Sequence, residues 1–234
     1  MSPRHRAAEL VGSALALRGL AVREHALALP RWPVALDGLR LALVSDIHAG
    51  GPQIRQRTVR EVVERTNAAH PDLIAVLGDV IDMQVVGGSP VHPDAVGREL
   101  SRLSSPLGVV GVLGNHDWSN DGRGVLRALR EAGIRVLENE ALAISARGTT
   151  FHVAGIADVQ TRRPDLVAAL RDVPAGSPVL LLSHNPDAFP QVPPRVSLTV
   201  SGHTHGGQVD LPLIRRLIIP SRYGDRYASG HVVE

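Results

Sequence analysis

Five short apolar runs, each followed at once by Asp, Asn or His, constrain the fold of this chain more than any other feature. They cover residues 41–44, 73–77, 109–113, 179–182 and 198–200. Their length and their content of Val, Leu and Ile are typical of strands that are buried on both faces. We therefore expect the five runs to be strands of an α/β protein that are buried on both faces.

Helical patterns separate the early runs, because apolar residues there recur every three or four positions. Strand alternating with helix is the signature of parallel βαβ units. After residue 134 the apolar residues form shorter runs that alternate with polar residues, at 141–145 and 150–154. This pattern is more typical of a second sheet. We find no internal repeat. We expect helices at residues 58–69, 95–103 and 124–132.

The polar clusters that end these strands should converge in space. In open α/β sheets the carboxyl ends of the strands line a common crevice. The D-x-H and H-x-H pairs place two side chains of a strand end on the same side, so both are aimed at one pocket. The clusters contain Asp46 and His48, Asp79 and Asp82, Asn115 with His116 and Asp117, His184, and His203 and His205.

Seven of these side chains offer an oxygen or an imidazole nitrogen to a metal. They are Asp46, His48, Asp79, Asn115, His184, His203 and His205. One ion cannot use so many protein ligands at ordinary coordination numbers, whereas two ions can, especially if one carboxylate bridges them. A mixed nitrogen and oxygen set suits Mn, Fe, Zn, Co or Ni better than Mg or Ca. The sequence thus predicts two divalent or transition-metal ions, with Mn, Fe or Zn favoured.

A purely structural interpretation has to be weighed against this one. A lone Asp after a strand is usually a turn former or a helix cap, and Asp187 in Asn-Pro-Asp fits that role. Lone histidines are commonly surface or hydrogen-bonded residues, an interpretation we apply to His5, His25, His70, His92, His152 and His231. Such an account fails for the clusters, because it must explain five independent strand ends that all carry ligand-type residues.

Composition removes several classes of function. The chain has no cysteine, which excludes disulfides, thiolate nucleophiles and cysteine-ligated metal sites. All 25 basic residues are arginines, scattered along the chain against 23 acidic residues, and aromatic residues make up only 3%. Neither a basic stripe nor a stacking platform is visible, so we expect no nucleic-acid partner.

Residues 1–36 precede the regular alternation of strands and helices. No uninterrupted apolar window of about 18 residues exists, and the best candidate, residues 10–29, is broken by charged residues. We interpret residues 1–36 as a peripheral N-terminal segment and residues 37–234 as one domain. We expect a cytoplasmic protein whose contact with a membrane is at most peripheral.

The five clusters resemble, in order, the motifs of the calcineurin-like metallophosphoesterases: D-x-H, GDxxD, GNH[DE], a lone His after an apolar strand, and GHxH. The motif positions span residues 46 to 205, and none is missing. His-Asn-Pro-Asp and Gly-His-Thr-His-Gly-Gly-Gln also look like the bacterial branch that includes phosphodiesterases and UDP-diacylglucosamine pyrophosphatase-like enzymes.

The resemblance implies a four-layer αββα sandwich of two mixed β-sheets flanked by helices, with a two-metal site. It implies that Asp46, His48, Asp79 and His205 hold one metal, and that Asp79, Asn115, His184 and His203 hold the other. It makes His116 the catalytic histidine and Asp82 its orienting partner. A hydroxide bridging the two ions would then attack phosphorus, while His116 stabilises a phosphoryl oxygen or protonates the leaving group.

Three functions remain open at this point. The first is a metal-dependent phosphoester hydrolase, a phosphodiesterase or pyrophosphatase, acting on a small phosphoester or a lipid pyrophosphate. The second is a non-catalytic scaffold of the same fold, and the third is another two-metal hydrolase, of amides or lactones. A scaffold would have no use for His116 and Asp82.

An exposed sheet edge near the end of the chain would favour pairing with a second copy, so we expect that a homodimer can form.

Overall fold

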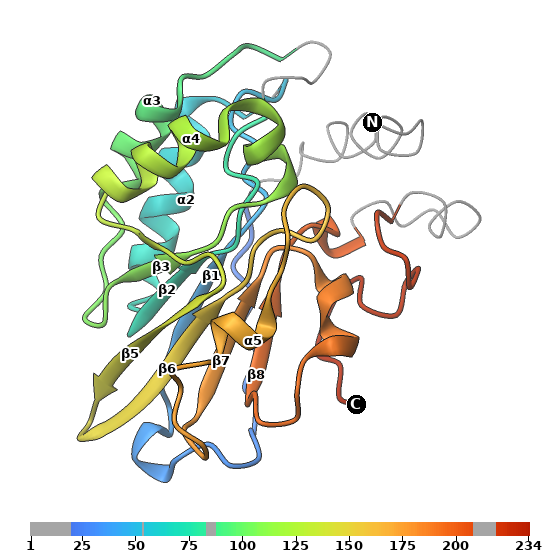
Figure 1. Cartoon of the computed structure of the whole chain (residues 1–234). Helices are drawn as coiled ribbons and strands as arrows, with labels where there is room; N and C mark the ends of the chain where they lie inside the picture. Colours follow the sequence, from blue (N-terminus) through green and yellow to red (C-terminus); the bar gives the residue numbers. More distant parts are fainter. Residues whose placement is uncertain (1–19, 53, 83–87, 208–218) are drawn as a thin grey trace.

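The computed structural model describes residues 20–52, 54–82, 88–207 and 219–234. Two four-stranded sheets form its centre (Figure 1). The first sheet has the order β1-β2-β3-β4 and the second β5-β6-β7-β8. The strands are β1 (Leu41–Val44), β2 (Leu73–Val76), β3 (Val109–Gly111), β4 (Arg135–Val136), β5 (Glu140–Ala146), β6 (Thr149–Gly155), β7 (Val179–Ser183) and β8 (Leu198–Ser201).

The two-sheet architecture flanked by helices is confirmed, with a difference between the sheets. Every described pairing in the first sheet is parallel, so that sheet is not mixed. The second sheet is mixed, because β5 and β6 form an antiparallel hairpin while β7 and β8 continue in parallel. Strand β5 is the terminal strand of this sheet, and its side chains at 143–145 alternate between exposed and buried, which explains the alternating run at 141–145.

Helices cover the outer faces of the sheets. The α-helices are α2 (Gln56–Ala68), α3 (Pro93–Leu100), α4 (Asn115–Glu131) and the single turn α5 (Leu166–Ala169); three 3₁₀ turns are η1 (Val34–Leu36), η2 (Pro186–Gln191) and η3 (His205–Gly207). Helix α4 begins well before the predicted helix at 124–132. The sequence Asn120-Asp121-Gly122, which is typical of a turn, lies at a kink inside α4 rather than before its start, because the φ of −147° at Asp121 is not helical.

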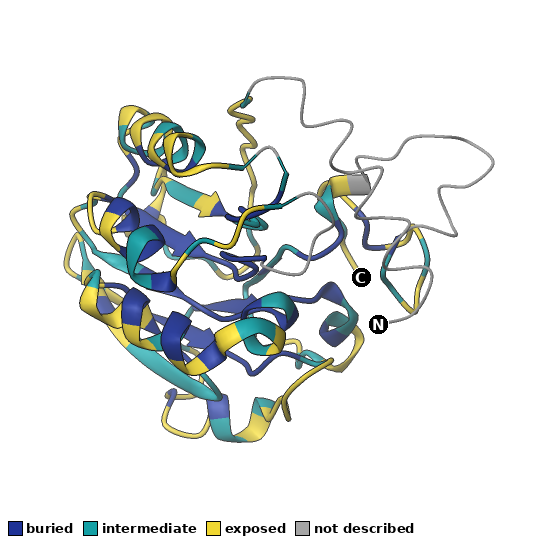
Figure 2. Cartoon of the chain, turned by 90° about the horizontal axis from the view of Figure 1, so that it is seen from above, coloured by how far each residue is buried: buried dark blue, intermediate teal, exposed yellow. Residues whose placement is uncertain are grey.

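Side-chain alternation along the inner strands divides the core into three layers. In β2, Ile74 and Val76 pack toward helices α2 to α4, whereas Leu73 and Ala75 pack toward the second sheet. In β7, Leu181 packs on the outer side with α5. Figure 2 shows these buried strands between helices that are exposed on their outer faces. Three apolar layers between four structural layers give the predicted αββα sandwich.

The prediction that residues 1–36 form a peripheral segment can be compared with the structure only from residue 20 onward, because residues 1–19 lie outside the described residues. The described residues 20–33 have no regular secondary structure before η1. Leu36 in η1 is fully buried against the inter-sheet core. Within the described ranges, no helix is both long enough and apolar enough to cross a membrane.

Glu99 ties α3 to α2 from a buried position. Its side chain accepts hydrogen bonds from Arg60 Nη2 and Gln56 Nε2, both at 2.9 Å. The hydrogen bond from Arg60 lowers the pKa of Glu99 despite its burial. We expect Glu99→Ala to lower the free energy of unfolding by about 1–2 kcal/mol, since charged hydrogen bonds are lost while the half-exposed Arg60 can rehydrate.

Urea unfolding of purified variants measures this effect. Glu61→Ala is the matched control, because Glu61 pairs with Arg65 on the exposed side of α2 and exposed pairs contribute little. Equal stability of the Glu99 and Glu61 variants would contradict the assignment of Glu99 as the stronger tie between the helices.

His152 is a buried histidine rather than the surface or hydrogen-bonded residue expected from the sequence. Its neighbours along β6, Phe151 and Val153, face the core between the two sheets. The ring of His152 therefore lies on the opposite, outer face of the strand. Its Nδ1 atom has no hydrogen-bond partner among the described residues. Burial, and then the positive charge of Arg195, lower the pKa of His152.

This lowered pKa makes stability depend on pH. Unfolded histidine titrates near 6.5, so below about pH 6.5 the unfolded chain gains a proton that folded His152 does not accept. Stability is therefore lost as the pH falls from about 6.5 toward the lower pKa of the folded state. We expect the free energy of unfolding of wild type to fall relative to that of His152→Leu over that range, because only wild type carries this histidine. Denaturant titration at several pH values measures both. A difference that is constant with pH would rule this out.

Candidate metal centre

The carboxyl ends of strands β1, β2, β3, β7 and β8 meet at one end of the sandwich, as the sequence predicts, and there the polar clusters come together. Strands β1 and β8 are the terminal strands of their sheets and are only partly buried, so the expectation of burial on both faces is wrong for these two. Asp46 follows β1, Asp79 follows β2, and His184 follows β7. Asn115 is the first residue of α4, directly after the loop from β3, and His205 begins η3 after β8. The strand order, rather than proximity in sequence, thus assembles the site.

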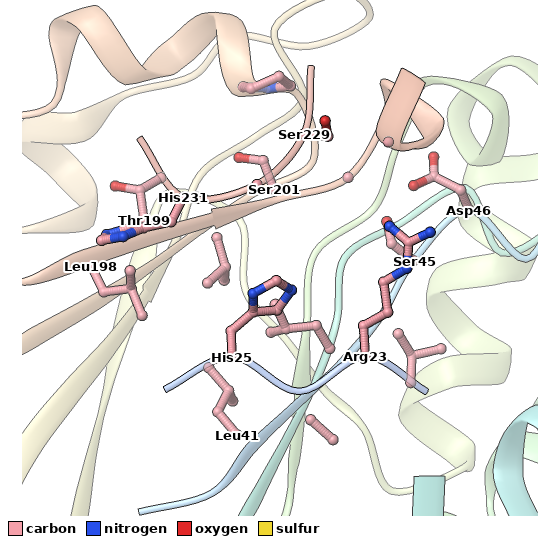
Figure 3. Close-up of a pocket in the computed structure, with 18 of the residues that line it drawn as sticks. Arg23, His25, Leu41, Ser45, Asp46, Leu198, Thr199, Ser201, Ser229 and His231 are labelled. Atoms are coloured by element: carbon pink, nitrogen blue, oxygen red, sulfur yellow. The ribbon is translucent and has the colours of Figure 1, made fainter. Parts of the chain in front are cut away.

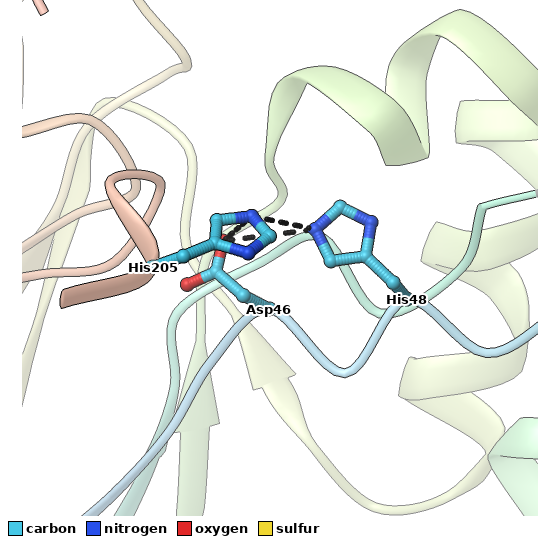
Figure 4. Close-up of side chains that lie close together, drawn as sticks. All are labelled: Asp46, His48 and His205. Carbon is cyan, nitrogen blue, oxygen red and sulfur yellow. Dashed lines mark hydrogen bonds and ion pairs between the residues drawn. The ribbon is translucent and has the colours of Figure 1, made fainter. Parts of the chain in front are cut away.

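The first group of ligand-type side chains contains Asp46, His48 and His205 (Figure 4). The Nε2 atoms of His48 and His205 are 3.0 Å apart. Asp46 Oδ1 lies 3.7 Å from His205 Nε2 and 4.0 Å from His48 Nε2. Burial lowers the pKa of His205 despite the opposing charge of Asp46. A neutral imidazole beside a carboxylate is the donor set that a divalent ion needs.

The second group contains Asp79, His184 and His203, all buried. His184 Nε2 lies 3.1 Å from Asp79 Oδ2 and 3.2 Å from Asn115 Oδ1. Nδ1 of His184 is 2.7 Å from the Leu77 carbonyl oxygen. Because that oxygen can only accept, Nδ1 donates to it and Nε2 is the nitrogen left to bind a cation.

Asp79 stands between the two groups. Its Oδ2 atom lies 3.1 Å from His184 Nε2 and 3.8 Å from His48 Nε2, so one oxygen faces a histidine of each group. This atom is buried and has no hydrogen-bond partner among the described residues. A buried carboxylate oxygen without a partner is costly unless it binds a cation. The residues present therefore fit a pair of metal ions that share Asp79.

The charges in this pocket favour a cation. Burial opposes ionisation of Asp79, yet the positive charge of His184 holds the Asp79 pKa well below its usual range. Burial also lowers the pKa of His184, but the Asp79 charge outweighs it and raises that pKa to about 10, so a metal ion bound at Nε2 would displace a proton from it. Burial, followed by the charge of His184, lowers the pKa of His203 to about 3, so His203 is neutral.

His116 and Asp82 lie beside the first group. His116 Nδ1 is 3.2 Å from Asp82 Oδ2, and His48 Nδ1 is 3.4 Å from the same oxygen. The backbone N–H of His116 donates to Asp79 Oδ1 at 2.9 Å. Burial lowers the pKa of His48, but its hydrogen bond to Asp82 and the Asp79 charge more than compensate, so the net shift is upward. The structure thus pairs Asp82 with two histidines, whereas the sequence predicted one.

The loops that carry the ligands are strained and tightly packed. Left-handed backbone conformations, uncommon for residues with a side chain, occur at Asp46 (φ 53°), His48 (49°), Asp79 (51°), His203 (68°) and His205 (52°). A side chain at position 114 would place its Cβ 2.2 Å from Asp79 Oδ1, which explains the glycine there. Backbone strain of this kind clusters at functional sites.

Asp117 joins two of the ligand loops without reaching the ligand cluster itself. Its Oδ2 atom accepts from Gly114 N at 2.9 Å, and its Oδ1 accepts from the backbone N–H groups of Val80 and Ile81. Burial and the Asp79 charge raise its pKa to about 6. Asp117 therefore both caps α4 and fastens the loop after β2.

The structure brings together the side chains that the sequence singled out: Asp46, His48, Asp79, Asp82, Asn115, His116, His184, His203 and His205. Asp187 lies outside the cluster, where its carboxylate binds Ser221 and Arg222. Sequence reasoning missed Gln160, whose side chain lies 2.8 Å from His203 Nε2. No motif marks Gln160, because its contact with His203 spans 43 positions of the chain.

A groove continues from the cluster along the open edge of the sandwich, where β1 and β8 are the terminal strands of their sheets (Figure 3). Leu41 and Leu198 line it on the apolar side. Ser45 lies at the end next to Asp46, and Arg23 and His25 come from the N-terminal segment opposite. The groove is thus apolar along the strands and polar near the candidate metal ligands.

A family model described as "Calcineurin-like phosphoesterase" matches residues 39–207. The chain belongs to this family. It is 32% identical over 210 residues to "Uncharacterized metallophosphoesterase YkuE" of Bacillus subtilis, covering 88% of this chain and 72% of that protein. It is also 32% identical to "Transmembrane protein with metallophosphoesterase domain" of Danio rerio, over 86% of this chain and 48% of that protein.

Other relatives of this calcineurin-like phosphoesterase show how much of their length it spans. A metallophosphoesterase of Aquifex aeolicus is 33% identical over 72% of this chain and 64% of its own length. The chain thus spans about half to three quarters of these three relatives. The solved NAD nucleotidase of Haemophilus influenzae shares the fold, with a TM-score of 0.51 at 15% identity, over 71% of this chain and 38% of that protein.

Proposed function

We propose that this calcineurin-like phosphoesterase is a binuclear enzyme that hydrolyses phosphodiesters or pyrophosphates. The observation that carries the proposal is Asp79 Oδ2, which is buried between the two histidine groups and lacks a hydrogen-bond partner among the described residues. Membership of the family supports metal-dependent phosphoester hydrolysis. The binuclear site and the substrate type are the proposed part.

The ligands divide into two sets that share Asp79. Asp46, His48 and His205 complete the first, and Asn115, His184 and His203 complete the second. When bound, the two ions supply positive charge to the phosphate oxygens and lower the pKa of water, the source of the nucleophile. The mixed nitrogen and oxygen donors suit Mn, Fe or Zn.

The protein's own residues supply proton transfer and orientation. His116 lies beside the shared Asp79 and stabilises a phosphoryl oxygen or protonates the leaving oxygen. Asp82, 3.2 Å from its Nδ1, accepts a hydrogen bond from Nδ1–H and holds the ring in one orientation, and a second proton on Nε2 is the one that His116 would donate. His116 Nε2 is then the atom that meets substrate. A non-catalytic scaffold would gain nothing from this pair.

The groove favours substrates with a substituent on each side of the scissile bond. It begins at Asp46 and runs between β1 and β8, so it can hold the group that a phosphomonoester lacks. Its apolar lining by Leu41 and Leu198 makes a lipid pyrophosphate the second candidate substrate. We propose no nucleic-acid partner, membrane contact that is peripheral at most, and pairing of exposed sheet edges as the route to a homodimer.

Hydrolysis of bis(p-nitrophenyl) phosphate and of p-nitrophenyl phosphate tests the proposal. Metal-stripped protein is titrated with Mn²⁺ while bound metal is counted in parallel. We expect metal-dependent release from the diester that exceeds release from the monoester. Greater activity on the monoester would overturn the substrate assignment. Two bound ions with no hydrolysis of these esters or of a lipid pyrophosphate would favour the scaffold instead.

A further inference from the structure

Two polar groups from outside the ligand cluster converge on Nε2 of His203. The side-chain amide nitrogen of Gln160, Nε2, lies 2.8 Å from this nitrogen, and the carbonyl oxygen of Pro220 lies 3.0 Å from it. These partners come from different loops, one after β6 and one near the end of the chain. Neither belongs to the motifs that supply the candidate ligands.

The chemistry of these partners selects one tautomer of His203. A carbonyl oxygen can only accept, so a hydrogen bond to Pro220 requires a proton on Nε2. With Nε2 protonated, the Gln160 amide nitrogen would face a second donor, so we infer that the amide turns by 180° and presents its oxygen to the same proton; the two ends of the amide are interchangeable by this rotation. With Nε2 protonated, Nδ1 of the neutral ring keeps the lone pair that a metal needs.

A buried carboxylate holds the Gln160 loop in place. Asp158 is 1% exposed, and its Oδ2 atom accepts from Gln160 N at 3.0 Å and from Thr161 N at 2.8 Å. The Thr161 hydroxyl donates to the same oxygen at 2.7 Å. Farther along the loop, Asn139 Nδ2 donates to the Arg163 carbonyl at 2.9 Å. The backbone of Gln160 is therefore fixed on both sides of the turn.

A second carboxylate holds the segment that presents Pro220. Asp187 accepts from the Ser221 hydroxyl at 2.6 Å and from Arg222 N at 2.9 Å. Its own N–H donates to Asn185 Oδ1 at 2.9 Å. Asp187 thus links the loop after β7 to the two residues that follow Pro220.

We propose that Gln160 is a positioning residue that, together with the Pro220 carbonyl, locks His203 in the Nε2–H tautomer so that Nδ1 is the metal-binding atom. Asp158 and Asp187 act one step farther out, by holding the two partners. The inference rests on the proposed role of His203 as a metal ligand. Partners that orient a ligating histidine typically change metal affinity by about 10- to 100-fold when removed.

The ring nitrogens of His203 report the tautomer directly, without metal or substrate. We would record ¹⁵N side-chain spectra of metal-free wild type and of Gln160→Leu, and assign His203 by its absence in His203→Asn. We expect wild type to show one tautomer protonated at Nε2, and Gln160→Leu to exchange between two. Gln160→Glu keeps an acceptor at this position and should restore the single tautomer.

Metal titration provides the second readout. We expect Gln160→Leu to bind the second equivalent of Mn²⁺ about 10- to 100-fold more weakly, with Gln160→Glu close to wild type. Gln191→Leu, a change of the same type at an exposed residue of η2, is the control. Gln160 is itself exposed, so its replacement does not disturb the core.

Each outcome has one meaning. A wild-type His203 protonated at Nδ1, or a Gln160→Leu protein with unchanged tautomer and unchanged Mn²⁺ affinity, would overturn the inference. A locked tautomer in a wild-type protein that binds metal but hydrolyses no phosphoester would instead contradict the proposed function and leave the positioning role intact.

Discussion

Asp79→Asn is expected to lose metal from both sites at once. The change removes the charge of the one carboxylate whose Oδ2 faces both histidine groups, while Asn Oδ1 can still accept from the His116 backbone N–H. Two bound ions contribute several kcal/mol to a phosphoryl-transfer transition state. At about 1.4 kcal/mol per tenfold, activity should fall by about 10³-fold or more.

Elemental analysis of purified protein, with phosphodiesterase assays at saturating Mn²⁺, measures both losses. Asp94→Asn is the matched control, because Asp94 pairs with Arg127 on the helical surface and lies outside the ligand cluster. A variant that retains one tightly bound ion would show that Asp79 serves a single site. Unchanged metal content would refute the bridging role altogether.

His116→Ala separates chemistry from metal binding. His116 is assigned to proton transfer and not to either ligand set, so the variant should keep its metal. Turnover should fall by about 10²- to 10⁴-fold, the range for general acid–base groups. The loss should be greatest for substrates with a poor leaving group, because only those need a proton on the departing oxygen.

Steady-state kinetics on two diesters with leaving groups of different pKa, beside metal analysis, make the comparison. His70→Asn changes an exposed histidine outside the ligand cluster and serves as control, because Asn tolerates the left-handed backbone at this position (φ 48°). Wild-type turnover in His116→Ala would remove it from the reaction. Loss of metal in that variant would reassign it as a ligand, as its distance from His48 and Asp79 allows.

The strands and the gathering of the site follow from the sequence because they depend on local pattern. Apolar runs such as residues 73–77 predict buried strands, and the carboxyl ends of parallel strands lie at the same edge of their sheet. The start of α4 could not be predicted in this way. The turn residues around Asp121 outweighed the weaker helical signal before them, and the cap that begins the helix depends on Asp117 reaching Gly114.

The partners of the ligands are harder to predict than the ligands themselves. Asp82 contacts His48 as well as His116 because the loops after β1 and β2 pack together, which no spacing within one motif reveals. The contacts of Gln160 and Pro220 with His203 depend on how separate loops close over the site. The burial of His152 could not be predicted either, because a single histidine in an alternating run fits either face of a strand.

The left-handed backbone at five candidate ligands affects how their contributions should be dissected by mutagenesis. Asp, Asn and His tolerate this conformation better than most residues, and glycine adopts it freely. An alanine scan of Asp46, His48 or His205 would therefore add a backbone penalty of about 1 kcal/mol to the loss of each ligand. Glycine is the unbiased reference residue at these positions, and alanine is appropriate only at Asn115, His116 and His184, where φ is not positive.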